Sequence, residues 1–229
     1  MTGHVGGPLR NVEVKLIDVP ELKYFSNNTN DEGEPLPQGE ICFRGQNAFQ
    51  GYFKNVKETE AAIDKDGFIH TGDIGQVHVN GSIKIIDRVK HIFKLSHGEY
   101  ICPTRLEEIY QVDKHIDQVF VYGDSFQNSL VAIVVPNRQT VIDWAEESKV
   151  QTQDFEALLQ EQAVKDKFVR IFKDQAKKHG LFGFEVPQKV HLSAEEFTSA
   201  NEMLTWTMKL NRTVIREKFT AQIEEMYKA

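Results

Sequence analysis

Apolar and polar residues alternate along much of the first third of the chain, a pattern that predicts β-strands. NVEVKLIDV places Val12, Val14 and Leu16 on one face, and GEICFRG has the pattern of a second strand with a glycine at each end. QVHV and SIKIID alternate on either side of Asn80–Gly81, the strongest short signal for a β-hairpin. Between these strands, NVKETEAAIDKDG predicts a short helix that Asn55 caps and Asp66–Gly67 ends.

Beyond about residue 90, helical periodicity becomes frequent. CPTRLEEIYQV predicts a helix with Pro103 in its first turn, and most of the segment from Asn137 to His179 is helical in pattern. DQVFVYGD, SLVAIVVP and PQKVHLS have the patterns of three further strands. NRTVIREKFTAQIEEMYK predicts one terminal amphipathic helix. The expected fold class is therefore α+β.

The change in character places a domain boundary near residues 87–90. A strand-rich part, residues 1–87, is followed by a compact α+β part, residues 88–229. The first strand begins almost at once, with no preceding segment that could pair with it, so we expect the chain to start in the middle of a fold.

Composition narrows the classes of function. The net charge of −7 argues against general nucleic-acid binding, which depends on Lys and Arg neutralising phosphates. Cys42 and Cys102 are too few for a disulfide framework, so we expect a reducing compartment and two buried thiols. Local spacing predicts no metal-ligand cluster around either cysteine or among the eight histidines. The start of the chain lacks the apolar core of a signal peptide, and no apolar run approaches the length of a membrane span, so we expect neither element.

Three stretches carry polar residues that a fold alone does not demand. In HTGDIG, Asp73 lies between two glycines, where a carboxylate could accept hydrogen bonds from a pair of sugar hydroxyls. A simple turn would explain the same residues. In LTWTMKLNR, Lys209 has no carboxylate within three residues and could reach an anion, although most such lysines are merely exposed.

The third stretch, IIDRVKHIFKLSHGEYI, begins as a buried strand and then fills with cations. Arg88, Lys90 and Lys94 precede a turn at Gly98, followed by Glu99. Arginine can form a fork onto phosphate or ribose oxygens, and lysine supplies a mobile charge. The stretch is therefore either a solvated basic hairpin or a segment that meets a polyanion.

In order and spacing, these stretches resemble consecutive core motifs of the adenylate-forming superfamily, which includes acyl-CoA synthetases, luciferases and peptide-synthetase adenylation domains. The resemblance is carried by GEICFRGQNAFQGYFKNVKETEAAIDKDGFIHTGDIG, IDRVKHIFKLSHGEYICPTRLEEIY and NEMLTWTMKLNR, and it covers nearly the whole chain. FKLSHGEYI and the helical insertion before GFEVPQKVHL are similar to the long-chain fatty acyl-CoA synthetase branch. Trp206 stands where relatives commonly have proline.

The resemblance implies a role for each residue of these stretches. Asp73 matches the aspartate that accepts from the ribose hydroxyls of ATP or AMP, and Arg88 the arginine that adds contacts to the nucleotide. Lys90 falls at the hinge position, and Lys209 matches the catalytic lysine that bridges the substrate carboxylate and the α-phosphate. The loop containing Lys94, Gly98 and Glu99 matches the side used for thioester formation with coenzyme A.

The same resemblance implies the C-terminal portion of a long-chain fatty acid–CoA ligase, with the β-rich end of a large domain followed by a small mobile domain. Such an enzyme forms an acyl-adenylate from fatty acid and ATP, and coenzyme A then displaces AMP. The Mg²⁺ ligands, the phosphate loop and the acyl tunnel are expected upstream, so the chain alone should be inactive. A cytoplasmic location, with or without peripheral attachment to an intracellular membrane, and no partner protein are expected. The alternative is a non-catalytic module of the same fold that binds nucleotide or a protein.

Overall fold

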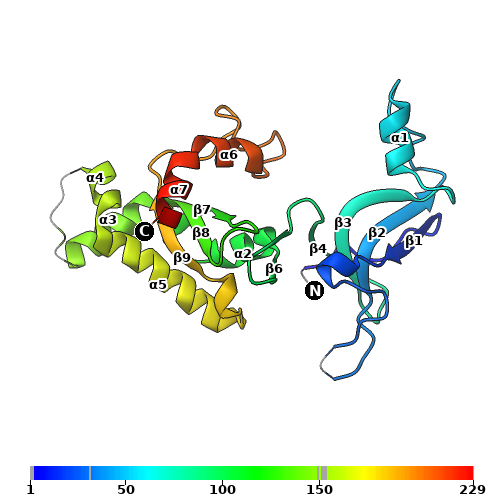
Figure 1. The fold of residues 1–229 in the computed structure, drawn as a ribbon, viewed down its shortest axis with the longest axis horizontal. Helices are drawn as coiled ribbons and strands as arrows, with labels where there is room; N and C mark the ends of the chain where they lie inside the picture. Colours follow the sequence, from blue (N-terminus) through cyan, green and yellow to red (C-terminus); the bar gives the residue numbers. More distant parts are fainter. Residues whose placement is uncertain (1–2, 31, 149, 151–153, 229) are drawn as a thin grey trace. The chain divides into compact units, whose positions relative to one another are not determined.

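The computed structural model describes residues 3–30, 32–148, 150 and 154–228, and the chain divides into two compact units. Unit 1 spans Met1–Ile92 and unit 2 spans Phe93–Ala229 (Figure 1). Each unit has its own sheet, and each is described by itself below.

Unit 1 is built on a four-stranded antiparallel sheet whose strands pair in chain order. The strands are β1 (Val12–Ile17), β2 (Gln38–Gly45), β3 (Ile69–Val77) and β4 (Ile83–Arg88). The predicted hairpin is confirmed, because β3 and β4 pair across the turn that holds Asn80–Gly81. A 3₁₀ turn, η1 (Pro20–Leu22), and helix α1 (Val56–Ala62) complete the unit. Asn55 caps α1 as predicted, since its side chain accepts from the Glu58 N–H at 3.1 Å.

A β-bulge interrupts the β3–β4 ladder between Ile74 and Gly75. Without this extra residue the register of the hairpin turn would continue unchanged, and Asp73 would pair with Asp87. With it, Asp73 pairs with Arg88. The bulge therefore exchanges an acidic neighbour of Asp73 for a basic one.

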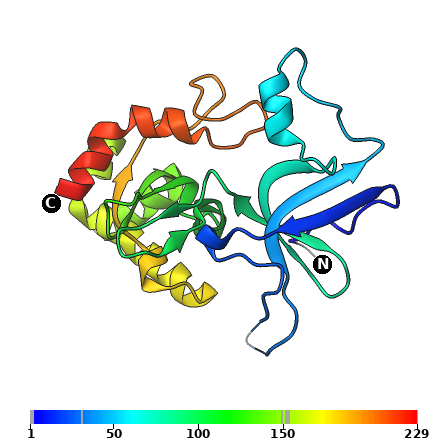
Figure 2. The ribbon, with the colours of Figure 1, turned by 45° about the vertical axis from the view of Figure 1, so that its right-hand side comes forward.

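Unit 2 contains a short hairpin, a three-stranded sheet and the remaining helices (Figure 2). The hairpin is β5 (Phe93–Lys94) with β6 (Tyr100–Ile101), and the sheet is β7 (Ile116–Tyr122), β8 (Leu130–Pro136) and β9 (Pro187–Leu192). β7 and β8 are antiparallel, whereas β9 runs parallel to β8. The helical elements are α2 (Pro103–Tyr110), α3 (Arg138–Glu147), α4 (Phe155–Gln160), α5 (Gln162–His179), η2 (Gly183–Glu185), α6 (Arg212–Lys218) and α7 (Thr220–Lys228).

The sheet of unit 2 has a hydrophobic cluster on each face. Alternate strand residues such as Val119, Val121 and Ala132 pack with the β5–β6 hairpin and helices α2 to α5 in the first cluster. Their neighbours, such as Phe120 and Ile133, pack with α6, α7 and the segment before α6 in the second cluster. Both faces are therefore buried, which explains why every residue of β8 is buried and why its sequence shows no alternation.

The predicted single terminal helix is wrong: it is two helices that meet at Phe219. The Thr220 hydroxyl donates to the carbonyls of Arg216 and Glu217, at 2.8 and 3.0 Å. A hydroxyl that occupies these carbonyls competes with the helical N–H groups and bends the helix. The bend lets both halves contribute apolar residues, including Ile215 and Ile223, to the second cluster.

Mixed helices and sheets confirm the α+β class. The division at Ile92–Phe93 lies beside the boundary expected near residues 87–90. That residues 88–229 form a mobile domain of a larger enzyme stays a prediction. In the parts of the chain that the structure describes, no helix combines the length and apolar character needed to cross a bilayer.

Candidate functional site

Asp73 and Arg88 face each other on neighbouring strands of unit 1. The Arg88 Nε donates to Asp73 Oδ1 at 2.8 Å, and their Cα atoms are partners in the β3–β4 ladder. The arginine side chain is 58% exposed and the aspartate 24%, so both can reach a ligand in solvent. The pair fixes the direction of the carboxylate while Asp73 Oδ2 and the remaining guanidinium donors can turn to other partners.

The backbone just before Asp73 has a left-handed conformation at Gly72. Gly72 has a φ of +69°, a left-handed value that costs a residue with a side chain about 1–2 kcal/mol. Its N–H donates to Glu40 Oε1 at 3.0 Å. The Thr71 hydroxyl donates to the Ile41 carbonyl at 2.7 Å and accepts from the Asp73 N–H at 3.0 Å. The glycine of the Thr-Gly-Asp motif thus has a conformational reason, and β2 supports the motif from behind.

The end of unit 1 carries the predicted hinge residue. Lys90 is exposed in the turn that follows β4. Just before it, Asp87 is 4% exposed and accepts from the Arg88 N–H at 2.7 Å, so the strand end is anchored up to that point. The His91 Nδ1 lies 3.4 Å from the same carboxylate. The fixed geometry of Asp87 next to an exposed turn is compatible with a pivot at Lys90, which stays a prediction.

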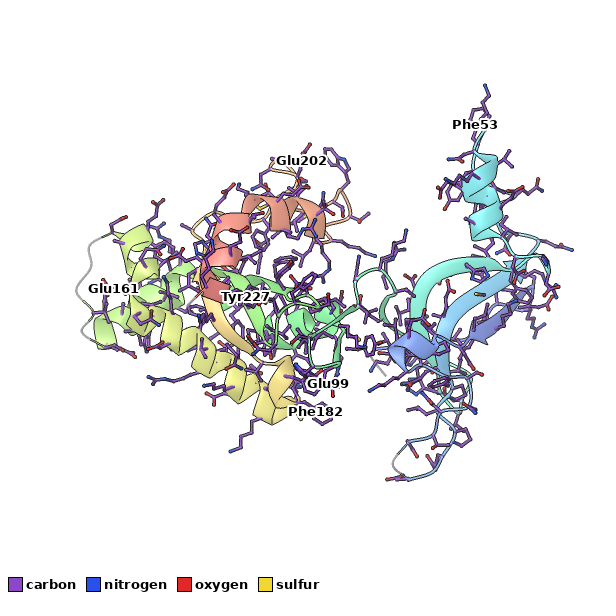
Figure 3. All side chains as sticks on the ribbon, in the orientation of Figure 1. Phe53, Glu99, Glu161, Phe182, Glu202 and Tyr227 are labelled. Carbon is purple, nitrogen blue, oxygen red and sulfur yellow. The ribbon has the colours of Figure 1, made fainter. Side chains whose placement is uncertain are left out.

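In unit 2, the β5–β6 hairpin contains Lys94, Gly98 and Glu99. Gly98 has a φ of +96°, and a Cβ built there would meet only the Lys94 Cε, at 3.8 Å. Lys94 is exposed, with its Nζ 5.3 Å from the centroid of the Tyr100 ring. Glu99 accepts through its backbone carbonyl from the Leu95 N–H at 2.8 Å and is marked in Figure 3. The hairpin therefore presents a cation beside a turn that favours glycine.

Lys209 lies in a tight exposed loop. The Thr205 N–H donates to the Lys209 carbonyl at 2.8 Å, and the Lys209 N–H donates to the Thr205 hydroxyl at 3.1 Å. Between them, Trp206 is 93% exposed, and Met208 is 69% exposed with a φ of +61°. The backbone of the loop is fixed by these bonds while its side chains, Lys209 included, project into solvent.

A buried ion pair holds the base of this loop. Arg212 binds both carboxylate oxygens of Glu107, at 3.0 Å from Nη1 to Oε1 and through a short contact from Nη2 to Oε2, and Nη2 also donates to the Thr104 hydroxyl at 3.1 Å. Glu107 Oε1 also accepts from the Val121 N–H at 2.8 Å, and its side chain is 7% exposed. Because Glu107 and Val121 belong to α2 and β7, the pair ties the loop to two core elements. Sequence reasoning missed this link.

The two candidate loops of unit 2 attach to opposite faces of its sheet. The hairpin contributes Leu95 and Ile101 to the first cluster, whereas the Lys209 loop contributes Met203 and Leu204 to the second. Within unit 1, Asp73 and Arg88 come together. Within unit 2, the Gly98 hairpin and the Lys209 loop are two separate groups.

No protein-family model matches the chain. Curated relatives do match: human long-chain-fatty-acid–CoA ligase 1 is 44% identical over 225 residues, which are 98% of this chain and 31% of the relative. Long chain acyl-CoA synthetase 6, peroxisomal, from Arabidopsis thaliana is 42% identical over 228 residues, 100% of this chain and 32% of the relative. The chain thus spans about a third of the length of the curated relatives it matches.

Solved structures give the same result for the fold. The adenylation domain of a carboxylate reductase from Mycobacterium chelonae matches 98% of this chain and 32% of its own, with a TM-score of 0.84 and 30% identity. The corresponding domain of a carboxylic acid reductase from Segniliparus rugosus, in complex with AMP and a co-purified carboxylic acid, matches with a TM-score of 0.83. The chain is therefore homologous to about a third of a long-chain-fatty-acid–CoA ligase, and its fold is one found in adenylate-forming proteins.

Proposed function

We propose that this chain is the part of a long-chain fatty acid–CoA ligase that holds the ribose of ATP and supplies groups to both half-reactions. The 44% identity to the human ligase over nearly the whole chain carries the proposal. The likeness to an adenylation domain solved with AMP and a carboxylic acid supports it for the nucleotide and for the substrate class. In the first half-reaction a fatty acid carboxylate attacks the α-phosphate of ATP, forming acyl-adenylate and releasing pyrophosphate. In the second, the thiol of coenzyme A attacks the acyl carbonyl, and AMP leaves.

Asp73 and Arg88 would act on the nucleotide. A carboxylate is the natural acceptor for two neighbouring hydroxyls, and the 2.8 Å bond from Arg88 to Oδ1 holds the Asp73 carboxylate in place. Arg88 keeps further donors for ribose or phosphate oxygens. The exposure of both side chains in a strand pair of fixed register supports a binding role, because an ion pair open to solvent contributes little to stability.

Lys209 would act in adenylate formation. Its cation can offset the negative charge that builds up when a carboxylate approaches a phosphate. The loop bonds to Thr205 and the buried Arg212–Glu107 pair hold the backbone, so the lysine can be presented at a fixed point while its side chain stays free to reach.

The Gly98 hairpin, with Lys94 and Glu99, would act in the thioester step. Because the hairpin and the Lys209 loop belong to opposite clusters of one sheet, unit 2 can offer one and withhold the other. A rotation at the Lys90 turn would exchange them, and such movements complete a site and exclude water. Mg²⁺ would accompany ATP, with its protein ligands outside this chain. A non-catalytic role in nucleotide or protein binding remains the competing proposal.

The two half-reactions can be measured separately in the full-length protein that contains this chain. We expect Lys209→Ala to slow acyl-adenylate formation by about 100-fold or more, the scale of losing one preorganised charge. The release of pyrophosphate measures this step. Given preformed acyl-adenylate, the same variant should transfer the acyl group to coenzyme A at nearly the normal rate. Gly98→Leu should slow the transfer of the acyl group to coenzyme A and leave acyl-adenylate formation at nearly the normal rate.

Matched controls separate these effects from misfolding. Gly81→Leu introduces a side chain at a comparable hairpin glycine, with φ of +79°, and should spare both steps. Lys178→Ala removes an exposed lysine of unit 2 that belongs to neither loop. If Lys209→Ala and Gly98→Leu impair both steps equally, the alternating roles are wrong. If wild-type protein releases no pyrophosphate with fatty acid, ATP and Mg²⁺, the ligase proposal itself is wrong.

A further inference from the structure

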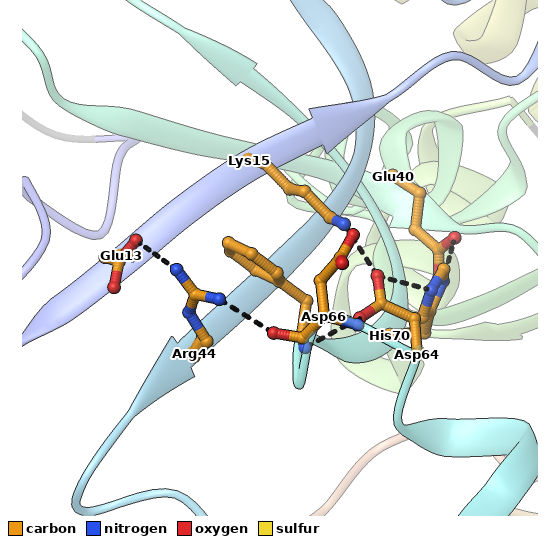
Figure 4. Close-up of polar contacts among 8 residues, drawn as sticks. Glu13, Lys15, Glu40, Arg44, Asp64, Asp66 and His70 are labelled. Carbon is orange, nitrogen blue, oxygen red and sulfur yellow. Dashed lines mark hydrogen bonds and ion pairs between the residues drawn. The ribbon is translucent and has the colours of Figure 1, made fainter.

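A cluster of chemically different side chains lies on one face of the unit 1 sheet. Cys42 on β2 is the direct cross-strand partner of His70 on β3 and of Lys15 on β1, so these three side chains form a row across the sheet. Glu40 reaches His70 from β2, and Asp64 reaches it from the loop after α1 (Figure 4). Neither the nucleotide pair nor the two loops of unit 2 uses this cluster.

Three of these residues converge as metal ligands do. One ligand atom each from Glu40, Cys42 and His70 lies within 4.8 Å of the others. Glu40 Oε2 is 3.0 Å from the His70 Nδ1, while its Oε1 is occupied by the Gly72 N–H. A tetrahedral zinc site would hold such atoms about 3.3–3.6 Å apart. Adjustments of about 1 Å in side-chain position would close the site around an ion.

A carboxylate also lies near the second imidazole nitrogen, where a metal-binding histidine commonly has one. His70 Nε2 lies 3.8 Å from Asp64 Oδ2, beyond hydrogen-bond distance. The adjustment that closes the site around an ion would have to bring these two atoms together, and the carboxylate would then orient the ring and favour the tautomer that leaves Nδ1 to the metal. Asp64 is itself held by Lys15 Nζ at 2.6 Å and by the Phe68 N–H at 2.8 Å, so its position is set by contacts other than that with His70.

The charges of the cluster would balance with a divalent ion in place. Glu40 and a Cys42 thiolate neutralise two positive charges, and Lys15 neutralises Asp64. Cys42 is fully buried, and a neutral thiol is only a weak hydrogen-bond donor among these charged groups.

We propose that Glu40, Cys42 and His70 bind a zinc-like divalent transition-metal ion, with Asp64 orienting the histidine. Binding would break the Cys42 S–H bond, form a metal–sulfur bond and release the proton to solvent. The thiolate and imidazole ligands favour Zn²⁺ or Co²⁺ over Mg²⁺, which prefers oxygen. Because Glu40 also holds Gly72, the ion would brace the strand that leads to Asp73.

Cobalt titration of the 229-residue chain tests the site, because Co²⁺ bound to a thiolate gives a near-ultraviolet charge-transfer band that oxygen and nitrogen ligands do not give. We expect one equivalent of Co²⁺ to produce the band, and Zn²⁺ to abolish it. Cys42→Ser should remove the band, and His70→Gln should weaken Co²⁺ binding by at least about 100-fold, more than the loss expected for an outer partner of a ligand. Cys102→Ser, which changes the other cysteine, should leave both unchanged.

Circular dichroism of each variant shows whether it folds. The His70 side chain is 29% exposed, whereas Cys42 is fully buried, so His70→Gln should disturb folding less and tests the site if Cys42→Ser does not fold. The proposal is wrong if wild-type chain gives no charge-transfer band. It is equally wrong if the band survives Cys42→Ser or is lost in Cys102→Ser, or if folded His70→Gln binds Co²⁺ as tightly as wild type. None of these measurements depends on ligase activity, so failure of the metal site and failure of the proposed function can be told apart.

Discussion

Removing the guanidinium of Arg212 should destabilise unit 2 far more than its place at the edge of an exposed loop suggests. The side chains of Arg212 and Glu107 are 19% and 7% exposed, and the pair is bidentate. Arg212→Met leaves the Glu107 carboxylate buried without its ion-pair partner, while Oε1 still accepts from the Val121 N–H. Breaking one partner of a buried pair typically costs about 3–5 kcal/mol, because the other charge stays without compensation. We expect a loss of free energy of unfolding in that range.

The positions of the tryptophans allow the stability of unit 2 to be measured separately. Both tryptophans, Trp144 and Trp206, lie in unit 2, so tryptophan fluorescence during urea unfolding reports on unit 2 even if the two units unfold separately. Glu107→Gln combined with Arg212→Met should cost about 1–3 kcal/mol less than the sum of the single changes, since the neutral amide can still accept from Val121.

An exposed ion pair supplies the control for this prediction. Lys218 and Glu195 form a contact with side chains 38% and 50% exposed, so Lys218→Met should cost less than about 1 kcal/mol. If Arg212→Met costs no more than Lys218→Met, or if the double variant is simply additive, the buried pair does not hold the loop base.

Three further outcomes follow from other contacts. Burial of Asp113 raises its pKa, but hydrogen bonds, chiefly those with the backbone N–H and ring of His115, outweigh burial and hold the pKa below the usual aspartate range. The free energy of unfolding that these bonds contribute should be complete above about pH 4 and decline as the pH falls through the lower folded-state pKa. Acid unfolding of Asp113→Asn should lack this pH-dependent loss of stability. Tyr110→Phe should cost about 1–3 kcal/mol in urea unfolding, because the buried hydroxyl donates to the Glu185 carbonyl at 2.8 Å; a change below 0.5 kcal/mol (about the size of a surface substitution) would contradict this. In the full-length protein, Lys90→Pro should slow the two half-reactions unequally, since proline fixes φ and removes an N–H at the proposed hinge; equal rates to wild type in both would remove the hinge from the mechanism.

Local signals were sufficient for most elements but not for the contacts between them. The Asn80–Gly81 turn and the Asn55 cap are set by residues a few positions apart, so alternation and capping patterns predict them. The break between the two terminal helices at Phe219 was not predicted, because the amphipathic pattern continues through it. The available signal was Thr220, whose hydroxyl competes for helix carbonyls.

The neighbours of the candidate residues depend on register, which a single sequence does not state. The hairpin turn alone would put Asp87 opposite Asp73, and only the bulge at Ile74–Gly75 brings Arg88 there. In the same way, no histidine lies close to Cys42 in the sequence, whereas the pairing of β2 with β3 puts His70 directly beside it. The roles of Asp73, Arg88 and Lys209 came from family resemblance and stay predictions.

Because side chains alternate in β7 and β8, adjacent residues of these strands pack in clusters that support different loops. Val121 lies in the cluster beneath the Gly98 hairpin, and Phe120, one position before it, lies in the cluster beneath the Lys209 loop. In β8, Ala132 and Ile133 divide in the same way. A protein engineer, or natural variation, could therefore loosen one loop through a single buried substitution and leave its counterpart on the other side of the sheet almost untouched. If the loops have the roles proposed for them, such a substitution would shift the balance between the two half-reactions without any change to Lys209 or Gly98.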